Sequence, residues 1–242
     1  NISTYSVDQI QDKNLDPWVQ SVCINSGKRS QKHKIYNLGE KIPNNLEQIW
    51  DYLSKKKINT AIWGPMNTTF KRSKHIKIFV PDPWHNQNTV KPKELKNIYN
   101  LARLYAQNYS DLNLVKSLPS FIKFFLYILK TNIIFTLLTS FTTYIKIILK
   151  KGIKNYFLFF LFDIISLLIF KKLTTNKNIN FSLIFLNSLA HFQHNNWDNI
   201  KDEKDYFYFT DQIFKIIFEI KKNYDSIIIY NSFSQKKIKT EY

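Results

Sequence analysis

The chain has 242 residues, 44% of them apolar, and a formal net charge of +17. This length allows one large domain or two small ones with a sizeable core. The basic residues are spread along the chain and nowhere alternate with aromatic residues as in RNA-binding sheets, so we expect no nucleic-acid partner. The charge suits an anionic substrate or an anionic membrane surface, while codon bias that places lysine at solvated positions is the alternative explanation.

The single cysteine, Cys23, excludes a disulfide within the chain and a cysteine-rich zinc site. It indicates a reducing compartment, so we expect a cytoplasmic location and a thiol buried among apolar groups. The chain has no initiating Met and no signal peptide, and it ends abruptly after residues 236–239. We therefore expect a fragment that lacks both ends of the natural protein.

The first half of the chain predicts steps of an α/β sheet. Residues 46–57 have a helical apolar period, and residues 58–63 then form a short apolar run that ends at Gly64-Pro65. Residues 76–80 predict a second strand, stopped by the two prolines of the sequence Pro81-Asp82-Pro83, and residues 93–105 predict a helix. Helix, strand and polar loop in this order are typical of an α/β fold.

Residues 121–170 are strongly apolar but interrupted by lysines. The longest uncharged run, 131–145, is shorter than the about 18–20 residues needed to cross a bilayer. We favour buried helices that pair as a hairpin through Lys151-Gly152. The alternative is that these helices lie on a membrane surface, which would make the protein membrane-peripheral. Transmembrane spans are the third interpretation.

The last part of the chain returns to the α/β pattern. Residues 181–185 predict a buried strand, 211–222 an amphipathic helix, and 225–230 a strand from the middle of a parallel sheet. We therefore predict an α/β fold with a largely parallel central sheet flanked by helices. Residues 1–117 and 173–242 would form the core, and 118–172 a helical insertion.

The clearest candidate for metal binding is the sequence from Ala190 to His194. His191 and His194 are three residues apart at the start of a helix or turn, so their imidazoles can face the same side, and neutral imidazole binds transition metals. At least one further ligand must come from elsewhere, and the candidates on polar loops after strands are Asp82, His85 and Asn231. Ordinary surface histidines are the alternative.

Two loops after predicted strands could line a ligand pocket. Prolines on both sides of Asp82 could hold it and Trp84 ready for a ligand, although a structural turn with Trp84 in the core fits as well. Gly64-Pro65 could bring the backbone before Asn67 close to a ligand, or form only a tight turn. A phosphate-binding Gly-rich loop, a dinucleotide fingerprint and a serine-hydrolase elbow are absent from the sequence.

Taken together, these loops resemble a known family. The sequences 63–67 (Trp-Gly-Pro-Met-Asn), 80–84 (Val-Pro-Asp-Pro-Trp), 187–194 with Trp197, and 231–235 (Asn-Ser-Phe-Ser-Gln) occur in that order. The set is similar to a bacterial branch of the alkaline-phosphatase-like superfamily, related to type I phosphodiesterases and nucleotide pyrophosphatases. Residues 16–20, Ser26-Gly27 and His33 also fit this branch.

The resemblance implies a divalent-metal cofactor, zinc or else manganese, and a phosphorylated or other anionic small-molecule substrate. The superfamily uses an Asp-x-x-x-His pair as metal ligands, and this frame falls on Asn187 and His191. A later Asp-His pair falls on Asn231 and Ser232, so both positions depart from the pattern and lose negative charge. Residues 16–20 contain no Ser or Thr, so the catalytic nucleophile stays unassigned.

The sequence thus predicts a metal-dependent hydrolase or transferase for a phosphate or sulfate ester. His191 would be a metal ligand, and His194 a second ligand or a general acid. The expected substrate-binding residues are Asn67, Asp82, Trp84, His85, Asn187 and Asn231. The first alternative is a non-catalytic protein that binds an anionic ligand in a degenerate metal site, and the second is a membrane-peripheral protein attached by 118–172.

Overall fold

The computed structural model of the chain describes residues 16–85, 89–107, 114–152, 154–175, 177–196 and 203–230. These residues fall into two compact units. The first unit holds the described residues up to 124 together with 179–185 and Tyr230, and the second holds 125–178 and 186–229.

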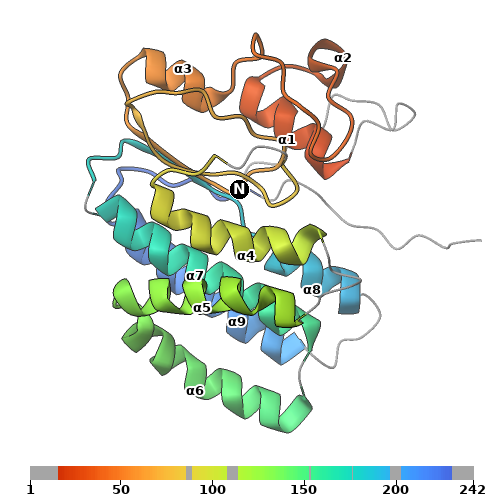
Figure 1. Cartoon of the computed structure of the whole chain (residues 1–242), viewed down its shortest axis with the longest axis vertical. Coiled ribbons are helices and arrows are strands. Elements are labelled where there is room, and N and C mark those ends of the chain that lie inside the picture. Colours follow the sequence, from red (N-terminus) through yellow and green to blue (C-terminus); the bar gives the residue numbers. More distant parts are fainter. Residues whose placement is uncertain are drawn as a thin grey trace, which may run out of the picture. The chain divides into compact units, whose positions relative to one another are not determined.

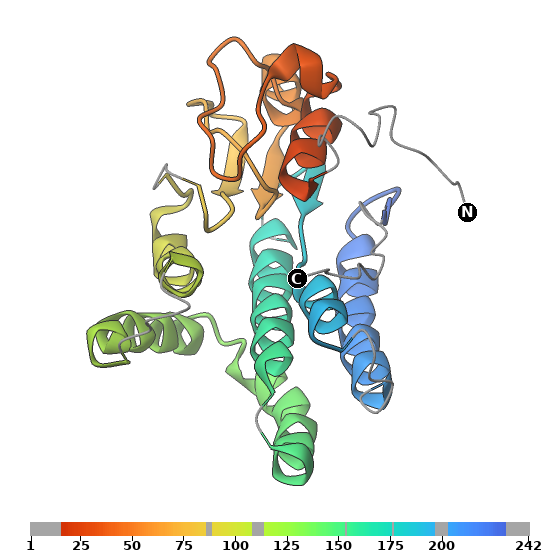
Figure 2. The same ribbon diagram turned by 90° about the vertical axis from the view of Figure 1, so that its right-hand side faces the viewer.

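A three-stranded parallel sheet forms the centre of the first unit (Figure 2). Its strands are β1 (Thr60–Trp63), β2 (Ile76–Val80) and β3 (Phe181–Ile184), in the order β2-β1-β3. Both neighbours of β1 run parallel to it, and Trp63 lies opposite Val80 on one side and Ile184 on the other. The predicted α/β fold with a parallel sheet is confirmed, and β2 has the predicted bounds.

Of the described helices, four lie wholly in the first unit, together with a short 3-10 helix, η2. Trp50 of α3 packs on the sheet against Ile62, Ile76 and Phe79, and its ring meets that of Phe79 edge-on at 6.5 Å. Burial of this large aromatic ring ties the helix to β1 and β2. The elements are α1 (Pro17–Ser26), α2 (Ser30–His33), α3 (Ile49–Lys55), η2 (Lys93–Leu95) and α4 (Lys96–Gln107).

Helix α3 begins later than its apolar period predicts, because Gln48 caps it. The backbone N–H of Gln48 donates to Asp51 Oδ2 at 3.0 Å. The Gln48 side chain donates to the carbonyl of Asn67 and accepts from the N–H of Thr69. Gln48 is therefore held by a loop that follows β1, and the regular helix starts at the next residue.

The predicted strand at 225–230 is wrong. The chain leaves helix α9 (Glu203–Lys221) through a turn in which Asn223 and Tyr224 donate to the carbonyls of Ile220 and Lys221. Residues 226–230 then form neither helix nor strand, and Ile228 is 85% exposed. An apolar run favours a strand only where a neighbouring strand accepts its hydrogen bonds, and in the described part of the sheet β3 is the last strand.

The second unit is helical, and its core is aromatic. Figure 1 shows α7 beside α8 and α9. Phe209 of α9 is fully buried, with ring centroids 4.7 Å from both Phe160 and Tyr144. The helices are α6 (Ile134–Lys151), α7 (Asn155–Thr175), α8 (Ser188–Asn196), α9 (Glu203–Lys221) and α5 (Leu114–Lys130), which continues from the first unit into the second.

These contacts group the chain differently from the predicted boundaries. The sequence assigned 173–242 to the sheet-containing core, whereas residues 186–229 cluster with α6 and α7. Phe192 of α8 packs against Tyr156 and Phe160 of α7, which explains this grouping. Among the residues that the structure describes, none of the helices has the length and apolarity to cross a membrane.

Candidate functional site

The candidate metal ligands lie at the start of α8, which a carboxylate of α7 fixes in place. Asp163 Oδ2 accepts the backbone N–H groups of Asn187 at 3.0 Å and of Ser188 at 2.8 Å. Burial raises the pKa of Asp163 to about 6, although these two N–H groups act against the rise. Asp163 therefore supplies an acceptor to N–H groups that a helix leaves without an internal partner.

Asn187 and His191 are brought together one turn apart. Asn187 Nδ2 lies 3.2 Å from His191 Nε2, and the imidazole stacks on the Phe159 ring with centroids 3.5 Å apart and planes inclined by 10°. Burial, and to a lesser degree the charge of His194, lowers the pKa of His191 to about 4. The ring is therefore neutral at physiological pH, and its Nε2 lone pair faces the Asn187 amide.

His194 follows on the same helix with its side chain exposed. Within the described ranges no group of three or more His, Cys, Asp and Glu side chains could hold a metal ion. The described residues thus bring together Asn187 and His191, with His194 nearby, while the carboxylate beside them, Asp163, accepts backbone N–H groups. Asn231, the other predicted amide at the site, lies outside the described residues.

The other predicted site residues belong to the first unit, where they form a buried network. The backbone N–H groups of Asn67 and Trp84 donate to the two oxygens of Asp82 at 3.0 and 3.1 Å. Tyr99 Oη lies 3.4 Å from the carbonyl of His85, and Asp82, Asn67 and His85 are all almost fully buried. The two loops meet because each follows one of two adjacent parallel strands.

Asn67 is the centre of this network. Its Oδ1 accepts the N–H of Gly39 at 2.8 Å, and its Nδ2 donates to the carbonyls of Asn37 at 3.0 Å and Trp18 at 3.3 Å. Its φ of 50° is left-handed, a conformation that asparagine tolerates better than most residues. The amide thus binds backbone groups of three residues in two segments of the chain, and a role of Asn67 in substrate binding stays a prediction.

Burial raises the pKa of Asp82 to about 7, with the N–H groups of Trp84 and Asn67 opposing the rise. The loop is also closely packed, because a Cβ at Gly39 would lie 2.7 Å from the carbonyl oxygen of Trp84. Trp84 itself is half-buried. This arrangement agrees with the structural-turn interpretation of the Pro81–Trp84 loop, and the expected ligand contacts of Asp82, Trp84 and His85 stay predictions.

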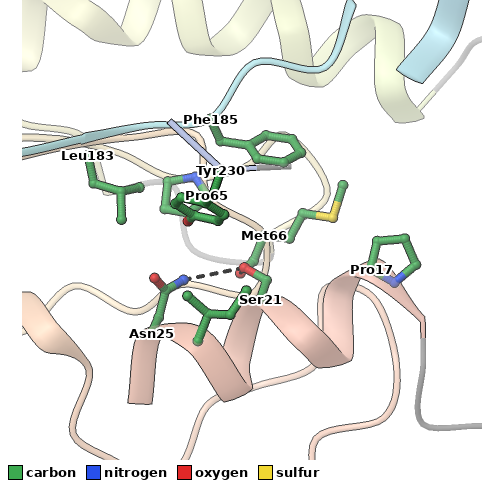
Figure 3. Close-up of a pocket in the computed structure, with 9 residues that line it drawn as sticks. Pro17, Ser21, Asn25, Pro65, Met66, Leu183, Phe185 and Tyr230 are labelled. Atoms are coloured by element: carbon green, nitrogen blue, oxygen red, sulfur yellow. Dashed lines mark hydrogen bonds between the residues drawn. The ribbon is translucent and has the colours of Figure 1, made fainter. Parts of the chain in front are cut away.

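A small cavity lies at the carboxyl ends of β1 and β3 (Figure 3). Ser21 Oγ donates to the carbonyl of Met66 at 2.8 Å, and Asn25 Nδ2 donates to Ser21 Oγ at 3.3 Å. The cavity of about 20 Å³ has room for about one water molecule, so it cannot hold an ester substrate. It is lined by Pro17, Ser21, Ile24, Asn25, Pro65, Met66, Leu183, Phe185 and Tyr230.

Cys23 does not lie among apolar groups alone, contrary to the prediction. Its Sγ is 3.2 Å from His33 Nε2, and His33 Nδ1 accepts the N–H of Ile35 at 3.0 Å. For a neutral ring this places the proton on Nε2, which donates to the sulfur. The two residues are ten positions apart, on different helices, so no local pattern in the sequence could have paired them.

Comparisons of the chain with protein-family models, with curated proteins and with solved structures each gave no match. The resemblance to the alkaline-phosphatase-like superfamily therefore remains an expectation.

Proposed function

We propose that this chain is part of a metal-dependent hydrolase or transferase for phosphate or sulfate esters. His191 would bind a divalent ion, zinc or manganese, together with the Asn187 amide oxygen. The observation that carries the proposal is the 3.2 Å separation between a neutral imidazole nitrogen and the Asn187 amide. His194 would be a second imidazole ligand or a general acid.

The separation suits two donors on one ion. Ligand atoms about 2.1 Å from a tetrahedral zinc ion are about 3.4 Å apart. Rotation of the Asn187 amide by half a turn would present Oδ1 in place of Nδ2. Because the pKa of His191 is about 4, no proton would compete with a metal at neutral pH. A bound divalent ion would supply charge stabilisation for the attacking and leaving oxygens of the ester.

The competing proposal is a protein that binds an anionic ligand in a reduced site without turnover. It is supported by Asn187, whose neutral amide offers a weaker ligand than the carboxylate of the superfamily pattern. Metal content decides between the two. The chain would be equilibrated with zinc or manganese, desalted and measured by elemental analysis as wild type, His191→Ala, His194→Ala and, as a matched control, His75→Ala in the first unit.

Stoichiometric metal that is lost in His191→Ala and kept in His75→Ala would support the hydrolase proposal. Loss in His194→Ala as well would assign His194 as a ligand rather than a general acid. An aryl phosphodiester would then be assayed for hydrolysis. Wild-type protein without bound metal would contradict the proposal, and calorimetric binding of a phosphorylated sugar without turnover would favour the reduced site.

A second candidate function, attachment to a membrane surface, is favoured by a different observation. Helices α5 and α6 expose large apolar side chains, among them Phe125 at 55% and Phe135 at 73%. We propose that these helices bind peripherally to a bilayer. Flotation of the full chain with phospholipid vesicles tests this, and a protein that stays at the bottom of the gradient with every vesicle composition contradicts it.

A further inference from the structure

Helix α5 presents one continuous apolar face to solvent. The exposed apolar residues follow the pattern i, i+3, i+4, i+7, i+8, i+11, so at about 100° per residue they lie on a single side of the helix. The exposed large apolar side chains of α5 are Leu118, Phe121, Ile122, Phe125, Leu126 and Leu129. We call this set the α5 face.

Lysines border the α5 face on one side. Lys123 and Lys130 are both exposed and seven residues apart, so they lie in one row along the helix. At about 100° per residue Lys130 is about 40° and Lys123 about 60° beyond Leu126, at the margin of the apolar arc. Lysine at this margin can keep its ammonium in the headgroup layer while its methylene stem lies along the apolar layer.

Helix α6 repeats the arrangement. Its exposed apolar residues also fall on one side of the helix, and the exposed Lys146 and Lys150 lie next to them. Lys151 lies about 100° further round and pairs inside the unit with Asp205 at 2.8 Å, which marks the side of α6 that faces the core. The exposed apolar residues are Phe135, Leu138, Ile145 and Leu149.

We infer that the α5 face is a lipid-binding surface selective for anionic membranes, with the helix parallel to the bilayer plane and its lysine row at the phosphates. This inference rests on the second candidate function and names its surface and its lipid class. The 17 residues of α5 span about 26 Å, and Lys123 lies near their middle. A helix that crossed the bilayer would therefore bury this charge, whereas a helix parallel to the bilayer plane keeps it hydrated.

Charge decides between a membrane and a second copy of the chain as the occupant of the α5 face. Between Asp111 and Asp163 the sequence has no acidic residue. Two copies packed through this surface would therefore bring lysine rows together without a carboxylate to pair with, whereas anionic headgroups complement them. The lysines of this stretch are Lys116, Lys123, Lys130, Lys146, Lys150, Lys151 and Lys154.

The test measures partitioning of the full chain onto vesicles of phosphatidylcholine alone or mixed with phosphatidylglycerol, at low and high salt. Phe125→Gln/Leu126→Gln removes part of the α5 face, and Phe207→Gln on α9 is the control, because Phe207 is 59% exposed, comparable to Phe125. Lys123→Gln/Lys130→Gln removes the lysine row. Lys28→Gln/Lys32→Gln removes the same charge from exposed positions of the first unit.

The wild type is expected to bind the anionic vesicles more tightly than the neutral ones, and less so at high salt. The apolar double variant should lose binding on the order of a hundredfold, and the lysine double variant roughly 25-fold on anionic vesicles at low salt. Both controls should stay within about twofold of the wild type. All substituted positions are exposed, and circular dichroism checks that each variant is folded.

Four results would overturn the inference. Equal binding to neutral and anionic vesicles, or full binding by both α5 variants, would leave membrane attachment standing but remove this surface or its selectivity. No binding of the wild type to any vesicle would overturn both the inference and the second candidate function. The last result combines two observations: the wild type does not bind vesicles, and it self-associates in sedimentation velocity. If Phe125→Gln/Leu126→Gln abolishes that self-association, the α5 face binds a second copy of the chain.

Discussion

Asp163 Oδ2 accepts the backbone N–H of Ser188 at 2.8 Å, so a side chain of α7 caps the helix that carries His191. Asp163→Ala removes this acceptor and leaves buried N–H groups without it, and we expect a loss of about 2 kcal/mol in the free energy of unfolding. Urea denaturation measures the loss. Asp211→Ala is the matched control, because Asp211 is exposed and pairs with Lys215 one turn away on α9. Equal effects of the two substitutions would contradict the capping role.

Asn67→Ala tests the network in the first unit. It removes the side-chain bonds to Gly39, Asn37 and Trp18 and places alanine at a φ of 50°, so we expect a loss of about 3–4 kcal/mol in unfolding free energy. Asn132 has a similar φ of 55° but is exposed, so Asn132→Ala should cost only the backbone part, about 1 kcal/mol. Thermal and urea unfolding of both variants measure the difference between their losses in unfolding free energy. This difference would vanish if the hydrogen bonds of the Asn67 side chain contribute nothing to stability.

The Asp82 carboxyl predicts a pH dependence of stability. Its pKa is about 7 in the folded protein, above the ordinary value of about 3.9 in an unfolded chain. A raised pKa means that the folded state favours the protonated acid. The stabilising contribution is therefore complete below about pH 4 and is lost as the pH rises through about 7, a change on the order of 4 kcal/mol.

Asp82→Asn removes this titration. The variant loses one oxygen acceptor, so it should be less stable than wild type at pH 5, and the gap should narrow by pH 8. Unfolding free energies at both pH values measure the gap, with Asp211→Asn as the exposed control. Asp163, whose pKa is raised to about 6, gives a dependence of the same sign. A gap that is constant with pH would show that Asp82 does not titrate in this range.

His191 should titrate in the opposite sense. Because its folded pKa of about 4 is below the ordinary value of about 6.5, it contributes stability above pH 6.5 that is lost as the pH falls through 4. Nuclear magnetic resonance of the imidazole Cε1–H gives the midpoint directly. Phe159→Ala removes the ring stacked on His191 and should raise the midpoint toward 6.5 by admitting water. An unchanged midpoint would mean that residues other than Phe159 bury the imidazole and lower the pKa of His191.

Phe209→Ala tests the aromatic core of the second unit. Phe209 is fully buried against Tyr144, Phe157 and Phe160, so its removal should cost about 3–5 kcal/mol. Phe207 lies on the same helix but is 59% exposed, and Phe207→Ala should cost less than about 1 kcal/mol. Denaturant unfolding of the pair checks this, and similar losses would mean that α9 is packed with a different face inward.

The strands of the sheet and the Asn187–His191 pair follow from local signals. Gly64-Pro65 and Pro81 end β1 and β2 because they interrupt regular pairing, and residues four apart meet on a helix whatever surrounds it. The strand predicted at 225–230 failed because the same apolar run, Ile227 to Tyr230, is compatible with a strand or an exposed extended segment. Only the presence of a neighbouring strand decides between them.

The sequence alone determined the α/β class, the parallel sheet and the place of the histidine pair, because each depends on residues a few positions apart. Tertiary structure decided that Asn67 and Asp82 bind backbone groups of distant loops, that Cys23 meets His33, and that α8 and α9 join α7 rather than the sheet. These outcomes depend on hydrogen bonds and packing between segments far apart in the chain. The energy of such contacts exists only once the fold has brought the segments together.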